Sequence, residues 1–112
     1  MDYRFLGRSG LKVSALSFGA ATFGGGNELF AAWGNTDVEE ARRLVDHCIE
    51  AGVNLFDVAN GYSTGLAEEI LGKALGKKRN HVLISTKVFF PMAGGPNDLG
   101  TSRFHILEQC DA

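Results

Sequence analysis

Hydrophobic residues recur at helical spacing over residues 38–49, with polar residues at most of the positions between them. Thr36 precedes this stretch and Glu39 follows three residues later, which is the pattern of a helix capping box. Gly52 comes after the last apolar position and is typical of a helix end. The pattern predicts an amphipathic helix whose apolar face consists of Val38, Ala41, Leu44, Val45, Cys48 and Ile49.

A second stretch of the same kind covers residues 66–75. Glu69 and Lys73 lie four positions apart on its polar side, which favours an ion pair, and Gly76 follows the stretch. We expect a second amphipathic helix, with an apolar face made of Leu66, Ala67, Ile70, Leu71, Ala74 and Leu75.

Runs of β-forming residues separate and precede these helices. Residues 3–6 and 11–14 enclose the sequence GRSG, which predicts a hairpin with a glycine-bearing turn. The runs VSALSFGA (13–20), VNLFDVA (53–59) and VLISTKVFF (82–90) have the apolar composition of strands in a buried parallel sheet. The alternation of strand and helix predicts an α/β fold with about three β/α units after the hairpin.

The end of the sequence bears on the domain organisation. After the loop PMAGGPNDLGT (91–101), Thr101 or Ser102 is suited to cap a last helix, whose pattern is still running at Ala112. Its apolar positions are Phe104, Ile106, Leu107 and Cys110. A closed (β/α)8 barrel takes eight units and roughly 250 residues. We therefore expect residues 1–112 to be a truncated part of a barrel rather than a complete open sheet.

Residues 20–35 form a long connection that contains Gly24, Gly25 and Gly26 in succession. Loops of this length in a compact domain are usually functional, so we expect this one to lie over the active face. Neither GxxxxGK[ST] nor a GxGxxG between strand and helix is present. We attribute the three glycines to loop flexibility rather than to phosphate binding.

Composition excludes several classes of function. The net charge is −2 and basic residues are scattered, so we expect no nucleic-acid partner and no membrane surface as partner. Asp2 and Arg4 stand where a signal peptide requires apolar residues, which favours a cytoplasmic location. Cys48 and Cys110 form no CxxC pair and no metal-ligand pattern, so we expect two buried thiols, no disulfide and no metal site.

Three ionisable residues lie at the ends of predicted strands. Asp57 ends the second parallel strand, Tyr62 follows in the connecting loop, and Lys87 lies at the end of the third. Because the C-terminal ends of parallel strands share one face, we expect the Lys87 ammonium within reach of both the Asp57 carboxylate and the Tyr62 hydroxyl. Singly, each residue has a structural explanation: a turn-capping carboxylate, a half-buried loop aromatic and a solvated strand end. The spacing of the three residues favours a functional role over these structural explanations.

The three residue types suit the reduction of a carbonyl group. Hydride arriving at a carbonyl carbon leaves charge on the oxygen, which Tyr62 would neutralise by donating a proton. A free phenol has a pKa of about 10, and a nearby cation such as Lys87 favours the phenolate. Asp57 would hold that ammonium in place through a charge-assisted hydrogen bond.

Several motifs in a fixed order resemble the N-terminal part of an aldo-keto reductase. They are the hairpin followed by SFG (17–19), NLFDVANGYS (54–63), AEEILGKAL (67–75) and LISTK (83–87), and together they cover essentially the whole chain. The resemblance implies the N-terminal portion of a (β/α)8 TIM barrel with the hairpin over its bottom. It further implies NADPH as cofactor and a small-molecule carbonyl substrate, an aldehyde or a ketone.

The resemblance also assigns roles to single residues. The family's catalytic Asp, Tyr and Lys match Asp57, Tyr62 and Lys87, whereas Val58 replaces a common Thr. The family's His after the next strand has no counterpart and would belong to the missing C-terminal part of the barrel, with most contacts to the adenosine phosphates. We accordingly expect the parent protein to be an NADP-dependent oxidoreductase and the isolated chain to be inactive.

Cofactor-binding positions follow from the same resemblance. Gly19, Ala20, Ala21 and Asp57 are expected beside the nicotinamide, although the family often has Thr and then Met or Trp where this chain has the two alanines. Aromatic walls suit a nicotinamide ring and an apolar substrate, and Phe30, Trp33, Phe89 and Phe90 are placed to provide them.

Two other interpretations stay open. The first is a nucleotide-binding regulatory module of the same fold, as in the potassium-channel beta subunits that resemble these reductases. The second is an inactive gene fragment without a stable fold of its own, because exposed edges of parallel strands promote aggregation.

Overall fold

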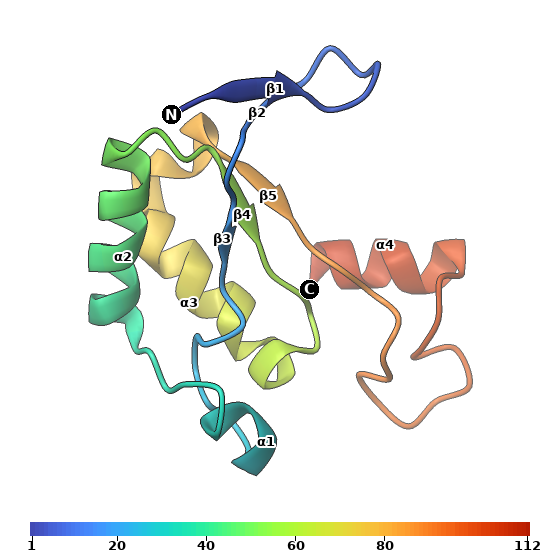
Figure 1. The fold of residues 1–112 in the computed structure, drawn as a ribbon. Coiled ribbons are helices and arrows are strands. Elements are labelled where there is room, and N and C mark those ends of the chain that lie inside the picture. The colour runs from blue at the N-terminus through green and yellow to red at the C-terminus, as the bar shows by residue number, and fades with distance from the viewer.

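The computed structural model describes residues 1–112, which form a two-stranded hairpin, a three-stranded sheet and the helices around it (Figure 1). In chain order, the elements are β1 (Tyr3–Phe5), β2 (Lys12–Ser14), β3 (Phe18–Gly19), α1 (Glu28–Ala31), α2 (Val38–Glu50), β4 (Leu55–Asp57), α3 (Leu66–Leu75), β5 (Leu83–Ser85) and α4 (Arg103–Asp111). Two 3-10 segments, Tyr62–Gly65 and Gly76–His81, flank α3.

The three-stranded sheet is parallel with the order β3-β4-β5, as the alternation of strands and helices predicted. Gly19 lies opposite Asp57, and Asp57 lies opposite Ser85, so the last residues of the three strands form one row. The first strand is shorter than the predicted run 13–20. The chain bends at Ala15 and Leu16 on its way from the hairpin to the sheet, and only Phe18–Gly19 pairs with β4.

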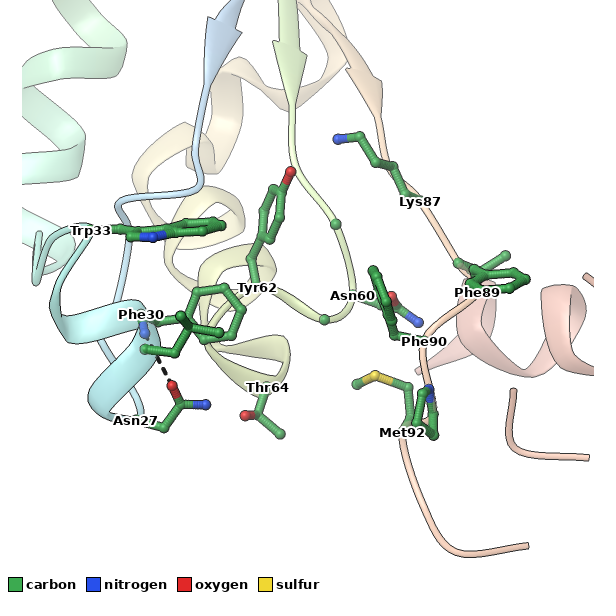
Figure 2. Close-up of a pocket in the computed structure, with 15 residues that line it drawn as sticks. Asn27, Phe30, Trp33, Asn60, Tyr62, Thr64, Lys87, Phe89, Phe90 and Met92 are labelled. Carbon is green, nitrogen blue, oxygen red and sulfur yellow. Dashed lines mark hydrogen bonds between the residues drawn. The ribbon is translucent and has the colours of Figure 1, made fainter. Parts of the chain in front are cut away.

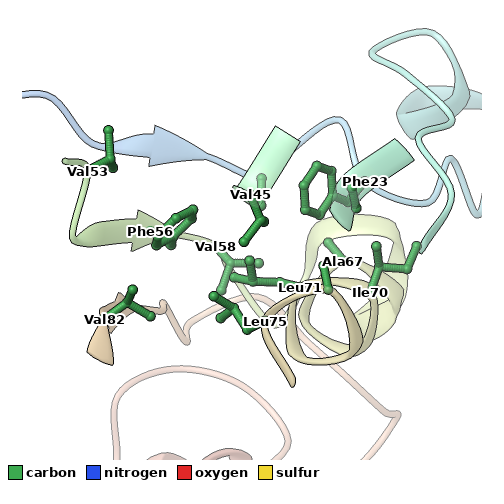
Figure 3. Packing of buried hydrophobic residues seen from close by; sticks show 13 residues of the cluster. Phe23, Val45, Val53, Phe56, Val58, Ala67, Ile70, Leu71, Leu75 and Val82 are labelled. Atoms are coloured by element: carbon green, nitrogen blue, oxygen red, sulfur yellow. The ribbon is translucent and has the colours of Figure 1, made fainter. Parts of the chain in front are cut away.

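Helices α2 and α3 pack against each other and cover one face of the sheet (Figure 3). Phe56 of β4 is fully buried beneath them, among side chains from both helices. Because side chains alternate along a strand, its neighbours Leu55 and Asp57 point to the other face, which no helix covers. The predicted apolar faces are confirmed: α2 contributes Ala41 and Val45 to the core, and α3 contributes Ala67, Ile70, Leu71, Ala74 and Leu75.

The start of α2 differs from the capping box predicted at Thr36. The residue that caps the helix is Asp37, whose Oδ1 accepts a hydrogen bond of 2.9 Å from the Glu40 backbone N–H. Thr36 is extended and pairs with Phe23 in an isolated bridge, with its backbone N–H donated to the Thr22 carbonyl. The helix therefore begins one residue later than the sequence pattern suggested.

The hairpin is fastened to the sheet by Asn54, the residue before β4. Its side-chain Oδ1 accepts from the Ser14 N–H at 2.8 Å, and its Nδ2 donates to the Lys12 carbonyl at 3.1 Å. The Tyr3 hydroxyl also donates to the Gly52 carbonyl at 2.8 Å. These bonds fix β1 and β2 at the N-terminal end of β4, opposite to the row of strand ends.

Helix α4 lies at the predicted position in the chain. Ser102 caps it by accepting from the His105 N–H, as expected. Figure 1 shows α4 apart from α2 and α3, so no second helix covers its apolar side chains. His105 is its one buried residue and both ring nitrogens lack a hydrogen-bond partner. The predicted apolar positions Phe104, Ile106, Leu107 and Cys110 are all exposed.

The two cysteines are free and differ in exposure. Cys48 packs against the core on α2, and burial raises the pKa of its thiol. Cys110 is exposed, so the predicted buried thiol at this position is wrong. No helix of the chain has both the length and the apolar composition needed to cross a membrane.

Candidate active site

Asp57 and Lys87 form an ion pair at the C-terminal ends of β4 and β5. The Lys87 Nζ lies 2.6 Å from Asp57 Oδ2 and donates a second hydrogen bond of 3.0 Å to the Val58 carbonyl. Asp57 and Ser85 are opposite each other in the sheet, and Lys87 follows Ser85 by two residues, so both side chains leave the same face. The predicted contact between Asp57 and Lys87 is confirmed.

Tyr62 lies next to this pair, in the connection between β4 and α3. The Lys87 Nζ is 5.1 Å from the centre of the Tyr62 ring, and Figure 2 shows the ammonium and the hydroxyl on the same side of the pocket. An ammonium has three N–H donors, of which Asp57 and Val58 take two. Lys87 makes hydrogen bonds of full geometry to Asp57 and Val58 only, but the Tyr62 hydroxyl is near enough to help raise the pKa of the ammonium, and the third donor is free for it.

The surroundings of Lys87 keep it charged. Partial burial acts to lower the pKa of the ammonium, but the hydrogen bond and the negative charge of Asp57 act in the opposite direction, and Tyr62 adds to them. The net result is that the pKa of Lys87 is raised above its ordinary value of 10.5. A permanent cation therefore stands beside the Tyr62 ring at neutral pH.

A cavity of about 620 Å³ opens over these residues (Figure 2). Tyr62 and Lys87 lie at one end of it, and most of its lining residues are hydrophobic. The predicted aromatic walls are present: Phe30 and Trp33 come from α1 and the residues after it, and Phe89 and Phe90 come from the segment after β5. The ring centres of Phe30 and Tyr62 are 6.2 Å apart, so the aromatic wall lies next to the ionisable Tyr62.

Sequence reasoning missed several residues of this cavity, among them Leu29, Asn60 and Met92. Asn60 belongs to the connection that follows Asp57, and it is buried with its side-chain amide donated to Gln109 of α4. Its position was open to prediction, because every residue that follows a parallel strand end is near the same face. Met92 had no such signal in the sequence.

The backbone directly after Tyr62 is left-handed. Ser63 has φ 50° and Thr64 has φ 57°, values that cost an ordinary residue roughly 1–2 kcal/mol each. Ser63 is 3% exposed, and its hydroxyl donates to the Phe23 carbonyl and accepts from the Gly25 N–H, both at 3.0 Å. This turn is maintained by tertiary contacts rather than by the conformational preference of its residues.

The three consecutive glycines allow this loop to pack closely against neighbouring parts of the chain. Gly24 and Gly25 have φ of 102° and 71°, which favour glycine. A Cβ at Gly24 would lie 3.0 Å from the Ser63 Cβ, and a Cβ at Gly26 would lie 3.0 Å from the Ser63 carbonyl oxygen. A side chain at Gly24 or Gly26 would therefore crowd Ser63 in this turn.

The predicted cofactor positions differ in accessibility. Ala20 is 0% exposed and belongs to the hydrophobic core, while its N–H donates to the Asp57 carbonyl at 2.8 Å. Direct contact between Ala20 and a ligand is therefore excluded in this conformation. Gly19 is exposed and Ala21 is partly exposed, so both are accessible beside Asp57. Ala20 instead packs in the hydrophobic core beneath the site.

The cavity has the kind of lining that a flat, largely apolar ring requires. Its aromatic and apolar walls suit a flat ring, and the strand ends at Gly19 and Asp57 leave a free surface next to it. Among the residues lining the cavity, Lys87 is the single cation, and its charge is already paired with Asp57. The phosphates of NADPH would thus need cationic partners that do not line this cavity.

Comparison with known proteins gives a consistent result. The aldo/keto reductase family model matches residues 15–112. A probable voltage-gated potassium channel subunit beta from Oryza sativa subsp. japonica is 52% identical over 112 residues, covering 96% of this chain and 31% of that protein. An uncharacterized oxidoreductase of Bacillus subtilis is 38% identical, covering 95% of this chain and 33% of that protein.

A solved structure shows the same fold. The holo form of an aldo-keto reductase from Bacillus halodurans superposes with a TM-score of 0.78 at 34% identity, covering 99% of this chain and 34% of that one. The chain spans about a third of the length of the curated relatives it matches. Its hairpin and three β/α units are thus part of a TIM barrel, and the chain belongs to the aldo/keto reductase family.

Proposed function

We propose that the protein carrying this chain reduces an aldehyde or a ketone to the alcohol with NADPH. One observation carries the proposal: Lys87, paired with Asp57, lies beside Tyr62 at one end of an aromatic cavity. This arrangement places a proton donor, a permanent cation and an anion that orients the cation around the position that a carbonyl oxygen would occupy.

Each of the three residues has one role in the proposed reaction. Tyr62 donates its hydroxyl proton to the carbonyl oxygen as negative charge develops there. Lys87 stabilises the phenolate that Tyr62 becomes, using the N–H that Asp57 and Val58 leave free. Asp57 keeps the ammonium charged and fixes its direction. The substrate gains one hydride and one proton, so the product is the alcohol.

When bound, NADPH supplies the hydride. Gly19, Ala21 and Asp57 would border its nicotinamide, and the aromatic walls would exclude water from the reacting atoms. We infer that residues outside 1–112 complete the site, because this cavity holds no unpaired cation for the cofactor phosphates and the chain spans about a third of its relatives. The isolated chain is accordingly expected to be inactive.

The decisive test is Tyr62→Phe in the protein that carries this chain. The substitution keeps the ring against Phe30 and removes the proton donor, so turnover should fall by about a hundredfold or more. Affinity for NADPH, measured by fluorescence titration, should hardly change. Tyr3→Phe is the matched control, because the hydroxyl of Tyr3 bonds to Gly52 in the hairpin, away from the cavity. Full turnover in Tyr62→Phe would rule out Tyr62 as the acid.

A second candidate is a regulatory subunit of a potassium channel. It is favoured by the two plant relatives named as probable channel beta subunits, which are 52% and 51% identical to this chain. NADPH binding without turnover of any aldehyde or ketone, together with co-purification of a channel, would select this function. Turnover that depends on Tyr62 would select the reductase.

A further inference from the structure

Ser63 connects two parts of the cavity wall that are far apart in sequence. Its buried hydroxyl donates to the Phe23 carbonyl and accepts from the Gly25 N–H, 40 and 38 residues away. The hydroxyl thus uses its donor and one acceptor site at the same time, with nearly no access to water. Ser63 is the immediate neighbour of Tyr62.

On one side of this contact lies the base of the loop that carries the aromatic wall. Gly24 donates its N–H to the Thr36 carbonyl at 3.1 Å, and Thr36 donates to the Thr22 carbonyl at 3.2 Å, which closes the loop. Phe23 between them is fully buried in the core. Ser63 therefore bonds to a fixed part of the chain, while the same loop presents Phe30 to the Tyr62 ring.

On the other side lies the turn that aims Tyr62. The Tyr62 N–H donates to the Ala59 carbonyl at 3.1 Å, and the next two residues are left-handed, a backbone that neither Ser nor Thr prefers. If the Ser63 hydroxyl bonds were lost, the turn would be free to relax toward ordinary backbone angles. The position of the Tyr62 hydroxyl relative to Lys87 would then change.

We infer that Ser63 is a positioning residue, which holds the Tyr62 hydroxyl toward Lys87 and couples it to the loop of Phe30 through the contacts with Phe23 and Gly25. The role rests on the proposed function of Tyr62 as the acid. Gly24 and Gly26 contribute to the same contact, because their lack of side chains lets the loop backbone approach Ser63.

The test is Ser63→Ala in the protein that carries this chain, with kcat corrected for the folded fraction. A misplaced acid should lower kcat by about tenfold to a hundredfold, while affinity for NADPH stays unchanged. In the 15N-labelled chain, the Gly25 amide should exchange its hydrogen faster in Ser63→Ala than in the unmodified sequence. A purely structural residue would lower thermal stability and leave kcat per folded molecule intact, which would overturn the inference.

Gly26→Ala tests the same contact from the opposite side and serves if Ser63→Ala fails to fold. The new Cβ would push against the Ser63 carbonyl oxygen, so kcat should fall in the same direction. Gly94→Ala is the matched control, because a Cβ there meets no atom within 4 Å. Equal kcat in Gly26→Ala and Gly94→Ala would contradict the inference.

The outcome also separates this inference from the proposed function. Turnover that is lost in Tyr62→Phe but complete in Ser63→Ala refutes the positioning role alone. Full turnover in Tyr62→Phe refutes the proposed acid, and with it the catalytic part of the role of Ser63. The Gly25 exchange rate reports on the hydrogen bond itself and does not depend on any catalytic activity.

Discussion

Lys87 shows how one side chain joins two strands at the candidate site. Its ammonium bonds to the Asp57 carboxylate and the Val58 carbonyl of the neighbouring chain segment while it faces the Tyr62 ring. Since its pKa is raised in the folded state, Lys87 contributes stability that is fully present below the ordinary value of 10.5. That contribution is lost as the pH rises through the higher folded value.

A pH series on Lys87→Met tests this linkage. The unmodified chain and Lys87→Met should differ in free energy of unfolding by a constant amount from neutral pH up to about pH 10, and the difference should shrink at higher pH. Urea titrations at each pH measure it. Lys77→Met is the control, because Lys77 is exposed on the segment after α3. A difference that grows with pH would contradict the assigned direction of the pKa change.

At the residue scale, the contact between Asp57 and Lys87 was predictable, because it follows from their chemistry and from the order of the strands. Asp57 and Lys87 come together because parallel strands end on one face, which the pattern of apolar runs already indicated. Ser63 was not predictable in the same way. Its role depends on a left-handed backbone and on a contact with residues about forty positions earlier, and neither has a pattern in the local sequence. The burial of Ala20 was missed for a similar reason.

At the element scale, the start of α2 offers a direct comparison of two capping residues. Thr36 and Asp37 are each followed three positions later by a glutamate, so both fit the sequence pattern. Tertiary structure decides between them, because the backbone of Thr36 is occupied by its bonds with Thr22 and Gly24. Asp37 is left to accept from the helix.

Asp37→Ala should therefore lower the stability of the folded chain by about 1 kcal/mol, because the Glu40 N–H loses its acceptor. Thr36→Ala should cost clearly less, since its backbone bonds do not need the side chain. Thermal or urea unfolding of both variants, followed by circular dichroism, measures the difference. A larger loss of stability in Thr36→Ala than in Asp37→Ala would show that Thr36 caps the helix, as the sequence suggested.

The helices also show when the periodicity of apolar residues is sufficient to predict which side chains are buried. In α2 and α3 the apolar stripe and the sheet face each other, so the periodic pattern predicted the buried residues correctly. In α4 the apolar positions have no partner element, and His105 is buried in their place. A pattern of apolar residues predicts a helix face, but the burial of that face depends on what lies next to it.

At the scale of the whole molecule, the chain exposes more surface than a compact protein of its size. Its accessible area is 7318 Å² for 12.0 kDa, whereas a compact monomer of this mass exposes about 6,000 Å². The radius of gyration is 14.8 Å, against about 13 Å for a compact chain of this length. Figure 1 shows the hairpin, α4 and the segment after β5 extending away from the sheet, and most of the exposed large apolar side chains belong to these parts and the residues next to them.

An open parallel sheet with two unpaired edges is expected to associate with other chains. The excess surface of about 1,300 Å² is comparable to the area buried in a stable protein–protein interface, so its burial in a second copy would stabilise the fold. We expect the isolated chain 1–112 to sediment as dimers or larger species in a concentration-dependent manner. Sedimentation velocity over a hundredfold range of concentration measures this, and circular dichroism checks that the chain is folded. A folded monomer that persists at the highest concentration would show that the open sheet is stable without a partner.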